Sequence, residues 1–123
     1  VERSRGLGDV YKRQVGALNA LKSGEFGPPN MPENLDFAAL HSLLEEAVND
    51  LKNFSANEVD ACSEQEVLFK MGSIEWPFSA DSFILSFSLP NFYFHVTTMY
   101  DMLRMRGVSV GKLDFIGKMQ LKN

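Results

Sequence analysis

The chain has 123 residues, of which 45% are hydrophobic and 23% are charged, a composition typical of one soluble globular domain. Its formal net charge of −4 argues against nucleic acid as a partner, and no apolar run reaches the roughly 20 residues that a membrane-spanning helix needs. The single cysteine, Cys62, excludes an intrachain disulfide, and the first residues lack the apolar core of a secretory signal, so we expect a cytoplasmic protein with no membrane association.

The first residues do not read as part of a natural domain. Ser4 to Gln14, SRGLGDVYKRQ, resemble the translation of a transposase adapter used in DNA library preparation. We therefore exclude residues 1–14 from fold reasoning and expect the natural N-terminus to be missing. This stretch holds four of the 12 basic and two of the 16 acidic residues, so residues 15–123 carry eight basic against 14 acidic groups, a net charge of −6. That acidity further disfavours nucleic acid and anionic membranes as partners.

Two helices separated by a loop are expected next. Val15, Leu18 and Leu21 recur at three-residue spacing before Gly24, which is typical of the last turns of an amphipathic helix whose beginning is absent. The segment GPPNMPENLD is expected to be a loop, because its prolines prevent a continuous helix: Pro28, Pro29 and Pro32. Asp36 is the expected N-cap of a second helix that runs to Phe54.

Residues 67–78, VLFKMGSIEWPF, alternate with the period of two that predicts a β-hairpin. Gly72-Ser73 at its centre suits a type II′ turn, in which the first residue needs positive φ. The resulting register pairs Met71 with Ile74, Phe69 with Trp76, and Val67 with Phe78 on one face, and Lys70 with Glu75 on the other.

A long last helix is predicted to start at the N-cap Ser79, with Asp81 in its first turn, and to end at Gly107 after two arginines. Pro90 predicts a kink near residues 86–90, because proline lacks the N–H donor and clashes with the carbonyl of Ser86. The tail beyond this helix is expected to be extended. Three apolar side chains are expected to pack it against the helices: Val110, Phe115 and Ile116.

Leu89 to Gly117, LPNFYFHVTTMYDMLRMRGVSVGKLDFIG, resemble the C-terminal signature of an uncharacterised family in the DinB-like and YfiT-like superfamily, and the similarity covers about residues 15–117. The resemblance implies an all-α fold: an antiparallel four-helix bundle with a small β-hairpin before the last helix. The first helix and most of the second would be missing. Residues 15–117 would form the partial bundle and residues 118–123 a tail.

The resemblance also implies a test for a metal site. Many members of the superfamily hold a divalent ion such as zinc or nickel with three histidines on two helices, two of them four residues apart on the last helix. By position, His95 corresponds to the later of that pair, and Asn91, a poor zinc or nickel ligand, occupies the earlier one. We therefore expect no metal or other cofactor, with His95 as the candidate ligand on the last helix. His41 and Glu45, four residues apart on the second helix, could also form a metal pair, but we expect them to lie on a solvated flank of that helix. A packing role and a pocket or acid–base role also stay open for His95.

The pocket predicted around this histidine has five residues: His95, Asn91, Tyr93, Trp76 and Asp101. The first functional hypothesis is a non-catalytic or small-ligand-binding domain that has lost the superfamily metal, with an unknown ligand. The second is a metal- or thiol-dependent transferase or isomerase whose other ligands lie in the missing helices. The third is a module that forms a homodimer through its helices. A missing helix would also leave some apolar side chains without a partner, among them Phe37, Leu44 and Phe87.

Overall fold

A computed structural model describes residues 2–28 and 33–122 of the chain, and it describes the backbone alone for residues 2–11. The fold is mostly helical, with a small mixed sheet. The helical segments are α1 (Glu2–Ser23), α2 (Phe37–Lys52), α3 (Ala56–Asp60), α4 (Ala80–Ser82), the π-helical η1 (Phe83–Ser88), α5 (Leu89–Met105) and α6 (Lys112–Ile116). The strands are β1 (Glu25–Phe26), β2 (Glu66–Met71) and β3 (Ile74–Ser79).

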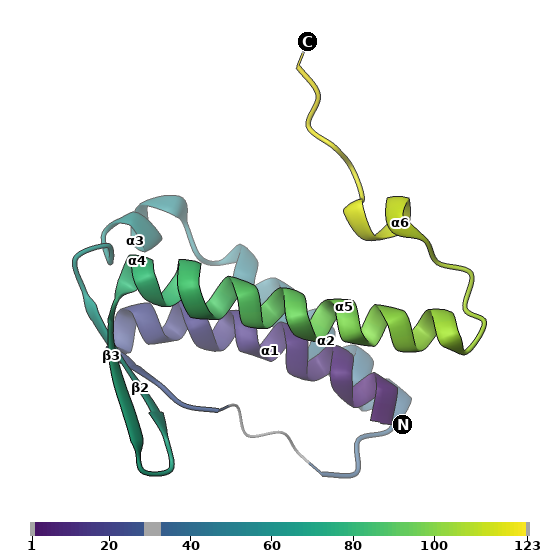
Figure 1. Cartoon of the computed structure of the whole chain (residues 1–123), viewed down its shortest axis with the longest axis horizontal. Helices are drawn as coiled ribbons and strands as arrows, with labels where there is room; N and C mark the ends of the chain where they lie inside the picture. The colour runs from purple at the N-terminus through teal and green to yellow at the C-terminus, as the bar shows by residue number, and fades with distance from the viewer. Residues whose placement is uncertain (1, 29–32, 123) are drawn as a thin grey trace.

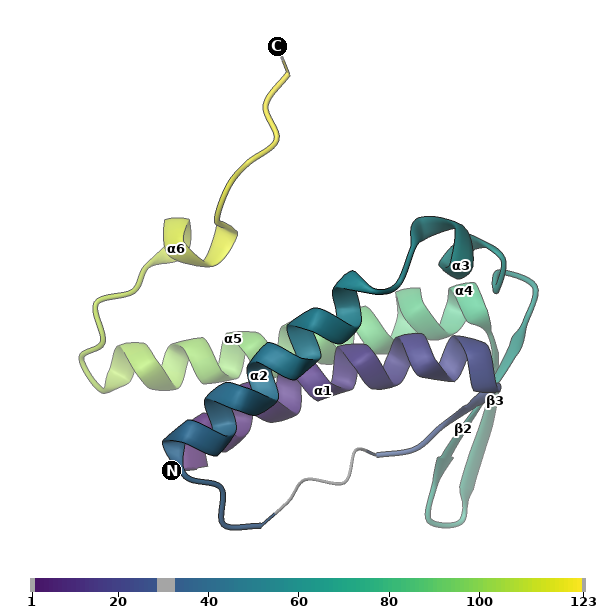
Figure 2. The ribbon, with the colours of Figure 1, turned by 180° about the vertical axis from the view of Figure 1, so that it is seen from behind.

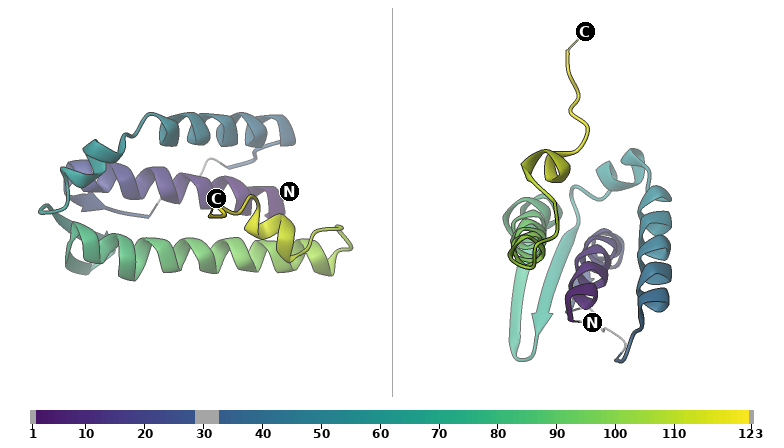
Figure 3. Two further views of the ribbon diagram at one scale, coloured as in Figure 1. Left: turned by 90° about the horizontal axis from the view of Figure 1, so that it is seen from above. Right: turned by 90° about the vertical axis from the view of Figure 1, so that its right-hand side faces the viewer.

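The three long helices lie side by side, with α1 between α2 and α5 (Figure 3). The sequence predicts only the last turns of α1, but the helix begins at Glu2 and includes the whole adapter-like stretch from Ser4 to Gln14. No proline interrupts residues 2–23, and α2 and α5 pack along the helix. Residues 2–14 therefore continue the helix without a local obstacle.

The second helix begins and ends close to where the sequence places it. Asp36 caps α2, since its carboxylate accepts a hydrogen bond of 2.8 Å from the Ala39 N–H. Phe37 in the first turn is 79% exposed and Leu44 is half-buried. Of the predicted loop before α2, Pro29 and Pro32 lie outside the described residues.

The predicted hairpin is confirmed in every pair of its register, from Val67 opposite Phe78 to Met71 opposite Ile74. Gly72 has φ of 59°, and Ser73 is not among the residues with positive φ, as a type II′ turn requires. Lys70 lies opposite Glu75, but its Nζ makes an ion pair of 2.8 Å with Glu25 from β1.

The all-α prediction needs a correction, because β1 pairs in parallel with β2 and completes a three-stranded sheet. Gly24, with φ of 81°, ends α1 and turns the chain toward this strand. The Gly24 carbonyl accepts a hydrogen bond of 2.8 Å from the Leu68 N–H. A side chain at Gly24 would approach the Glu66 carbonyl to 3.4 Å, so glycine fits both the turn and the close approach.

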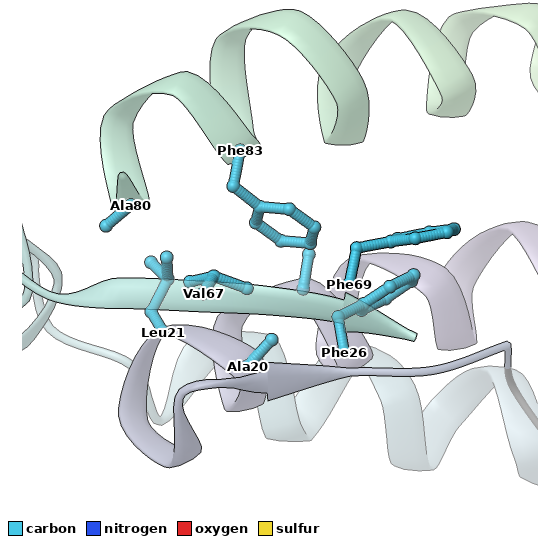
Figure 4. Close-up of a cluster of buried hydrophobic side chains, with 8 residues drawn as sticks. Ala20, Leu21, Phe26, Val67, Phe69, Ala80 and Phe83 are labelled. Carbon is cyan, nitrogen blue, oxygen red and sulfur yellow. The ribbon is translucent and has the colours of Figure 1, made fainter. Parts of the chain in front are cut away.

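The core lies where the sheet meets the end of α1 and the start of the last helical segment (Figure 4). Val67 from β2 and Phe83 from η1 are fully buried. Phe87, which the sequence analysis expects to lack a partner, instead packs edge-on against Phe69 with ring centroids 4.9 Å apart. That expectation was wrong because the β1–β2 pairing brings Phe26 and Phe69 beside η1.

The last helix starts and ends as predicted. The Ser79 hydroxyl accepts a hydrogen bond from the Ser82 N–H, and Gly107 follows the helix with φ of 82°. Directly before Pro90, where the sequence predicts a kink, the backbone is π-helical, and the Leu89 N–H donates to the Ile84 carbonyl five residues back. This wider turn relieves the clash that Pro90 would cause in a regular α-helix.

The tail was predicted to be extended, and this was wrong for residues 112–116, which form α6. Asp114 stabilises the start of α6 by accepting a hydrogen bond of 2.8 Å from the Gly111 N–H. Phe115 does pack as expected, edge-on against Tyr100 at 5.2 Å between ring centroids, whereas Ile116 stays 45% exposed. After α6 the chain projects away from the helices (Figure 1).

Candidate functional site

Two of the five predicted pocket residues lie together on α5. Asn91 and His95 are four residues apart, so they share one face of the helix, and both are half-buried. The same face carries the half-buried apolar side chains of Phe92, Val96, Met99 and Leu103. The helix α5 packs against α1 (Figure 3), and the half-buried face of α5 carries an amide and an imidazole among apolar side chains.

The other three predicted residues do not join this pair. Tyr93 is 54% exposed and Asp101 is also exposed, because their positions along α5 turn them toward other sides of the helix. Trp76 lies on β3, where its ring stacks on Phe69 with centroids 5.5 Å apart while half of the side chain meets solvent. Of the five residues, Asn91 and His95 therefore share a helix face, and Trp76 makes a packing contact with Phe69.

A second polar feature of α5 is the contact between Tyr100 and the tail. The half-buried Tyr100 hydroxyl donates a hydrogen bond of 2.6 Å to the Gly111 carbonyl. Burial raises the pKa of Tyr100, the Asp114 carboxylate raises it further, and the Arg104 guanidinium opposes the shift. A raised pKa keeps the hydroxyl protonated, which this hydrogen bond requires.

The described residues do not fit the metal site that the superfamily implies. Among residues 12–28 and 33–122, whose side chains the structure describes, no three His, Cys, Asp or Glu residues are grouped to hold an ion. His41 Nδ1 lies 3.5 Å from Glu45 Oε1, but both side chains are about 70% exposed on α2, as on a solvated helix flank. The Cys62 thiol donates to the Glu58 carbonyl at 3.3 Å.

A groove of about 260 Å³ between α1 and α2 is not among the sites that the sequence predicts. Lys12, Glu46 and Asp50 contribute charged groups to it. The remaining lining residues are Val15, Gly16, Asn19, Leu43 and Ala47. Glu46 and Asp50, one turn apart on α2, are the sequence signal for this surface, whereas Lys12 lies in the adapter-like stretch.

A further hollow of about 420 Å³ lies beside β1 and is lined by Ser23, Glu25, Phe26, Gly27 and Lys70. The hydrogen bond from Lys70 to Glu25 raises the pKa of the lysine, and the charge of Glu25 adds to this effect. Since the two charges neutralise each other, this hollow attracts a charged ligand less strongly than the groove between α1 and α2. No helix in the described part of the chain is long and apolar enough to cross a membrane.

The chain is similar to a known protein family and to a solved structure. Residues 10–116 match a family model described as a domain of unknown function, DUF1993. No curated protein matches the chain. A crystal structure of a DinB family member protein from Shewanella denitrificans matches with a TM-score of 0.76 and 22% identity, covering 98% of this chain and 68% of that chain. This likeness shows that the two proteins share a fold.

Proposed function

The chain belongs to the DUF1993 family of domains of unknown function, and from that premise we propose that it is a non-catalytic, small-ligand-binding domain of DinB-like fold. In this proposal the domain has lost the metal site of the superfamily that its last helix resembles. The chemistry of the half-buried face of α5 supports a binding role more directly than a metal-dependent reaction.

One observation carries the proposal: Asn91 stands one helical turn before His95 on the same half-buried face. In the metal-binding proteins that the last helix resembles, a histidine at the position of Asn91 completes a pair of metal ligands. An asparagine amide gives a neutral donor and acceptor, whereas zinc and nickel prefer imidazole nitrogen. The replacement keeps a polar group in place and removes a ligand, which suits the binding of a polar organic group better than that of a metal.

The surroundings of this pair favour a small ligand with both polar and apolar parts. Phe92, Val96 and Met99 give the face an apolar character, and the two polar side chains could fix the orientation of a ligand. Screening small polar fragments by NMR tests this proposal. We expect a hit to shift the Asn91 side-chain amide signals and to be lost in His95→Ala, and the absence of any such hit would count against a ligand site here.

Restoring the missing histidine tests the loss of the metal. Two histidines four residues apart on one helix face can chelate one ion, so Asn91→His is expected to raise the melting temperature in the presence of Ni²⁺ or Zn²⁺. At a metal concentration of about 100 times the Kd, the gain is ~2.7 kcal/mol. Asn91→Gln is the matched control, and adding His95→Ala to Asn91→His should abolish the gain.

The alternative function is a metal- or thiol-dependent transferase whose remaining ligands lie in a segment outside this chain. Elemental analysis of a longer family member separates the two functions. Stoichiometric zinc or nickel that is lost on His95→Ala would overturn the binding-domain proposal. Metal-free protein whose stability does not change on His95→Ala would overturn the transferase.

We also propose that α1, α2 and the segment from α4 to α5 correspond to the second, third and fourth helices of a four-helix bundle whose first helix is not represented. The 68% coverage of the DinB family member and the exposed Phe37 support this assignment. A structure of a longer family member would test it: an added helix should cover Phe37, and a helix placed elsewhere would contradict the assignment.

A further inference from the structure

The segment after α6 differs from the rest of the chain in both position and chemistry. Residues 117–122 extend away from the helices (Figures 1 and 2) and have exposed side chains. Met119 is 56% exposed and Leu121 is 79% exposed. Such side chains gain free energy when a partner surface removes them from water.

The order of residues in this segment gives it two faces. Lys118, Gln120 and Lys122 alternate with the apolar Met119 and Leu121. In an extended backbone, successive side chains point to opposite sides, so the two apolar side chains share one side and the two lysines share the other. A groove with an apolar floor and acidic rims would match both sides at once.

The groove between α1 and α2 has this character. Its lining includes the apolar residues Val15, Leu43 and the buried Ala47, which we call its floor. The exposed carboxylates of Glu46 and Asp50, also in the lining, lie on α2. Over its whole length α2 carries three acidic residues and one lysine. Lys12 is the one cation among the described lining residues, so the groove keeps a net negative charge.

We propose that residues 118–122 of one copy of the chain bind in the α1–α2 groove of a second copy. Met119 and Leu121 would contact the floor, and Lys118 and Lys122 would approach Glu46 and Asp50. The carboxylates lie roughly 6 Å apart along the helix axis and the lysines roughly 13 Å apart in an extended chain, a difference that flexible lysine stems can span. A second copy suits the segment because it points away from its own helices (Figure 2).

Charge reversal in the full-length chain, followed by sedimentation equilibrium at low salt, tests the proposal. Lys118→Glu and Lys122→Glu in the segment, and Glu46→Lys and Asp50→Lys in the groove, are each expected to weaken the dimer about twofold to fivefold. Lys12→Glu should strengthen it by a similar factor, because it removes a repulsion. This opposite sign separates contact in the groove from a general effect of charge.

Exchanging the charges of an acidic groove residue and a lysine of the segment is the decisive experiment. Glu46→Lys combined with Lys122→Glu should recover most of the affinity that each loses alone, and raising the salt concentration should weaken the wild-type dimer. A dimer that is indifferent to these changes, or a chain that stays monomeric while the swaps alter only its stability, would overturn the proposal. The second result would show that the segment binds to its own groove.

Discussion

At the scale of single residues, Tyr100 connects the tail to the last helix. Its hydroxyl donates to the Gly111 carbonyl and its ring packs against Phe115. One side chain therefore contacts both the residue directly before α6 and a residue within α6. Asp114 holds the same turn by accepting the Gly111 N–H. The position of α6 therefore depends on a phenol that has to remain protonated.

Tyr100 gives the stability of the chain a dependence on alkaline pH. Because its folded-state pKa is raised, its contribution is complete below the ordinary tyrosine pKa of about 10 and is lost as pH rises through the raised value. We expect the urea midpoint to fall above about pH 10 in the wild type, and part of this fall to be absent in Tyr100→Phe. Tyr93→Phe, at an exposed position of the same helix, is the matched control. Equal pH dependence in both variants would contradict the role of Tyr100.

At the scale of elements, the hairpin depends on the left-handed backbone of Gly72. An alanine Cβ at this position would meet no atom within 4 Å, so the cost of substitution comes from the positive φ alone. We expect Gly72→Ala to lower the free energy of unfolding by about 1–2 kcal/mol in urea denaturation. Ser73→Ala, in the same turn but without positive φ, should change it by less than about 0.5 kcal/mol. Equal losses would show that the turn has another conformation.

Local signals explain which elements the sequence could predict. The hairpin, with its period of two, and the helix starts at Asp36 and Ser79 depend on neighbouring residues, and the structure confirms them. The strand β1 has only two residues and pairs with a segment more than 40 positions away, so no hydrophobic periodicity or capping residue predicts it. Pro90 predicts a break in the helix, but it does not predict that the backbone before it is π-helical.

The candidate site follows the same rule. Asn91 and His95 share a face because of helix geometry, so their pairing was predictable from spacing alone. Grouping Trp76 with them required a contact between the hairpin and the middle of α5, and Trp76 stacks on Phe69 instead. The groove between α1 and α2 depends on the packing of two helices, and α1 includes the adapter-like stretch, which carries no pattern of a natural domain.

At the scale of the whole molecule, α1 has a neighbour on both sides, whereas α2 and α5 keep large apolar side chains in solvent. Phe37 on α2 is 79% exposed, and on α5 Phe94 is 66% and Met105 is 85% exposed. On α5 itself no side chain is fully buried. The core near the sheet is well packed, while α2 and α5 present apolar surface of the kind that promotes association.

We therefore expect this chain to aggregate as its concentration rises. Burial of apolar surface drives such association, and sulfate strengthens it, whereas salt should weaken the contact between the tail and the groove. Light scattering should show particle size increasing with protein concentration and with ammonium sulfate. Replacing Phe37, Phe94 and Met105 together by serine should suppress this increase, and the exposed Ser42→Ala is the control that should leave it unchanged. A monomer that stays monodisperse under these conditions and melts in one sharp transition would show that the exposed side chains need no covering.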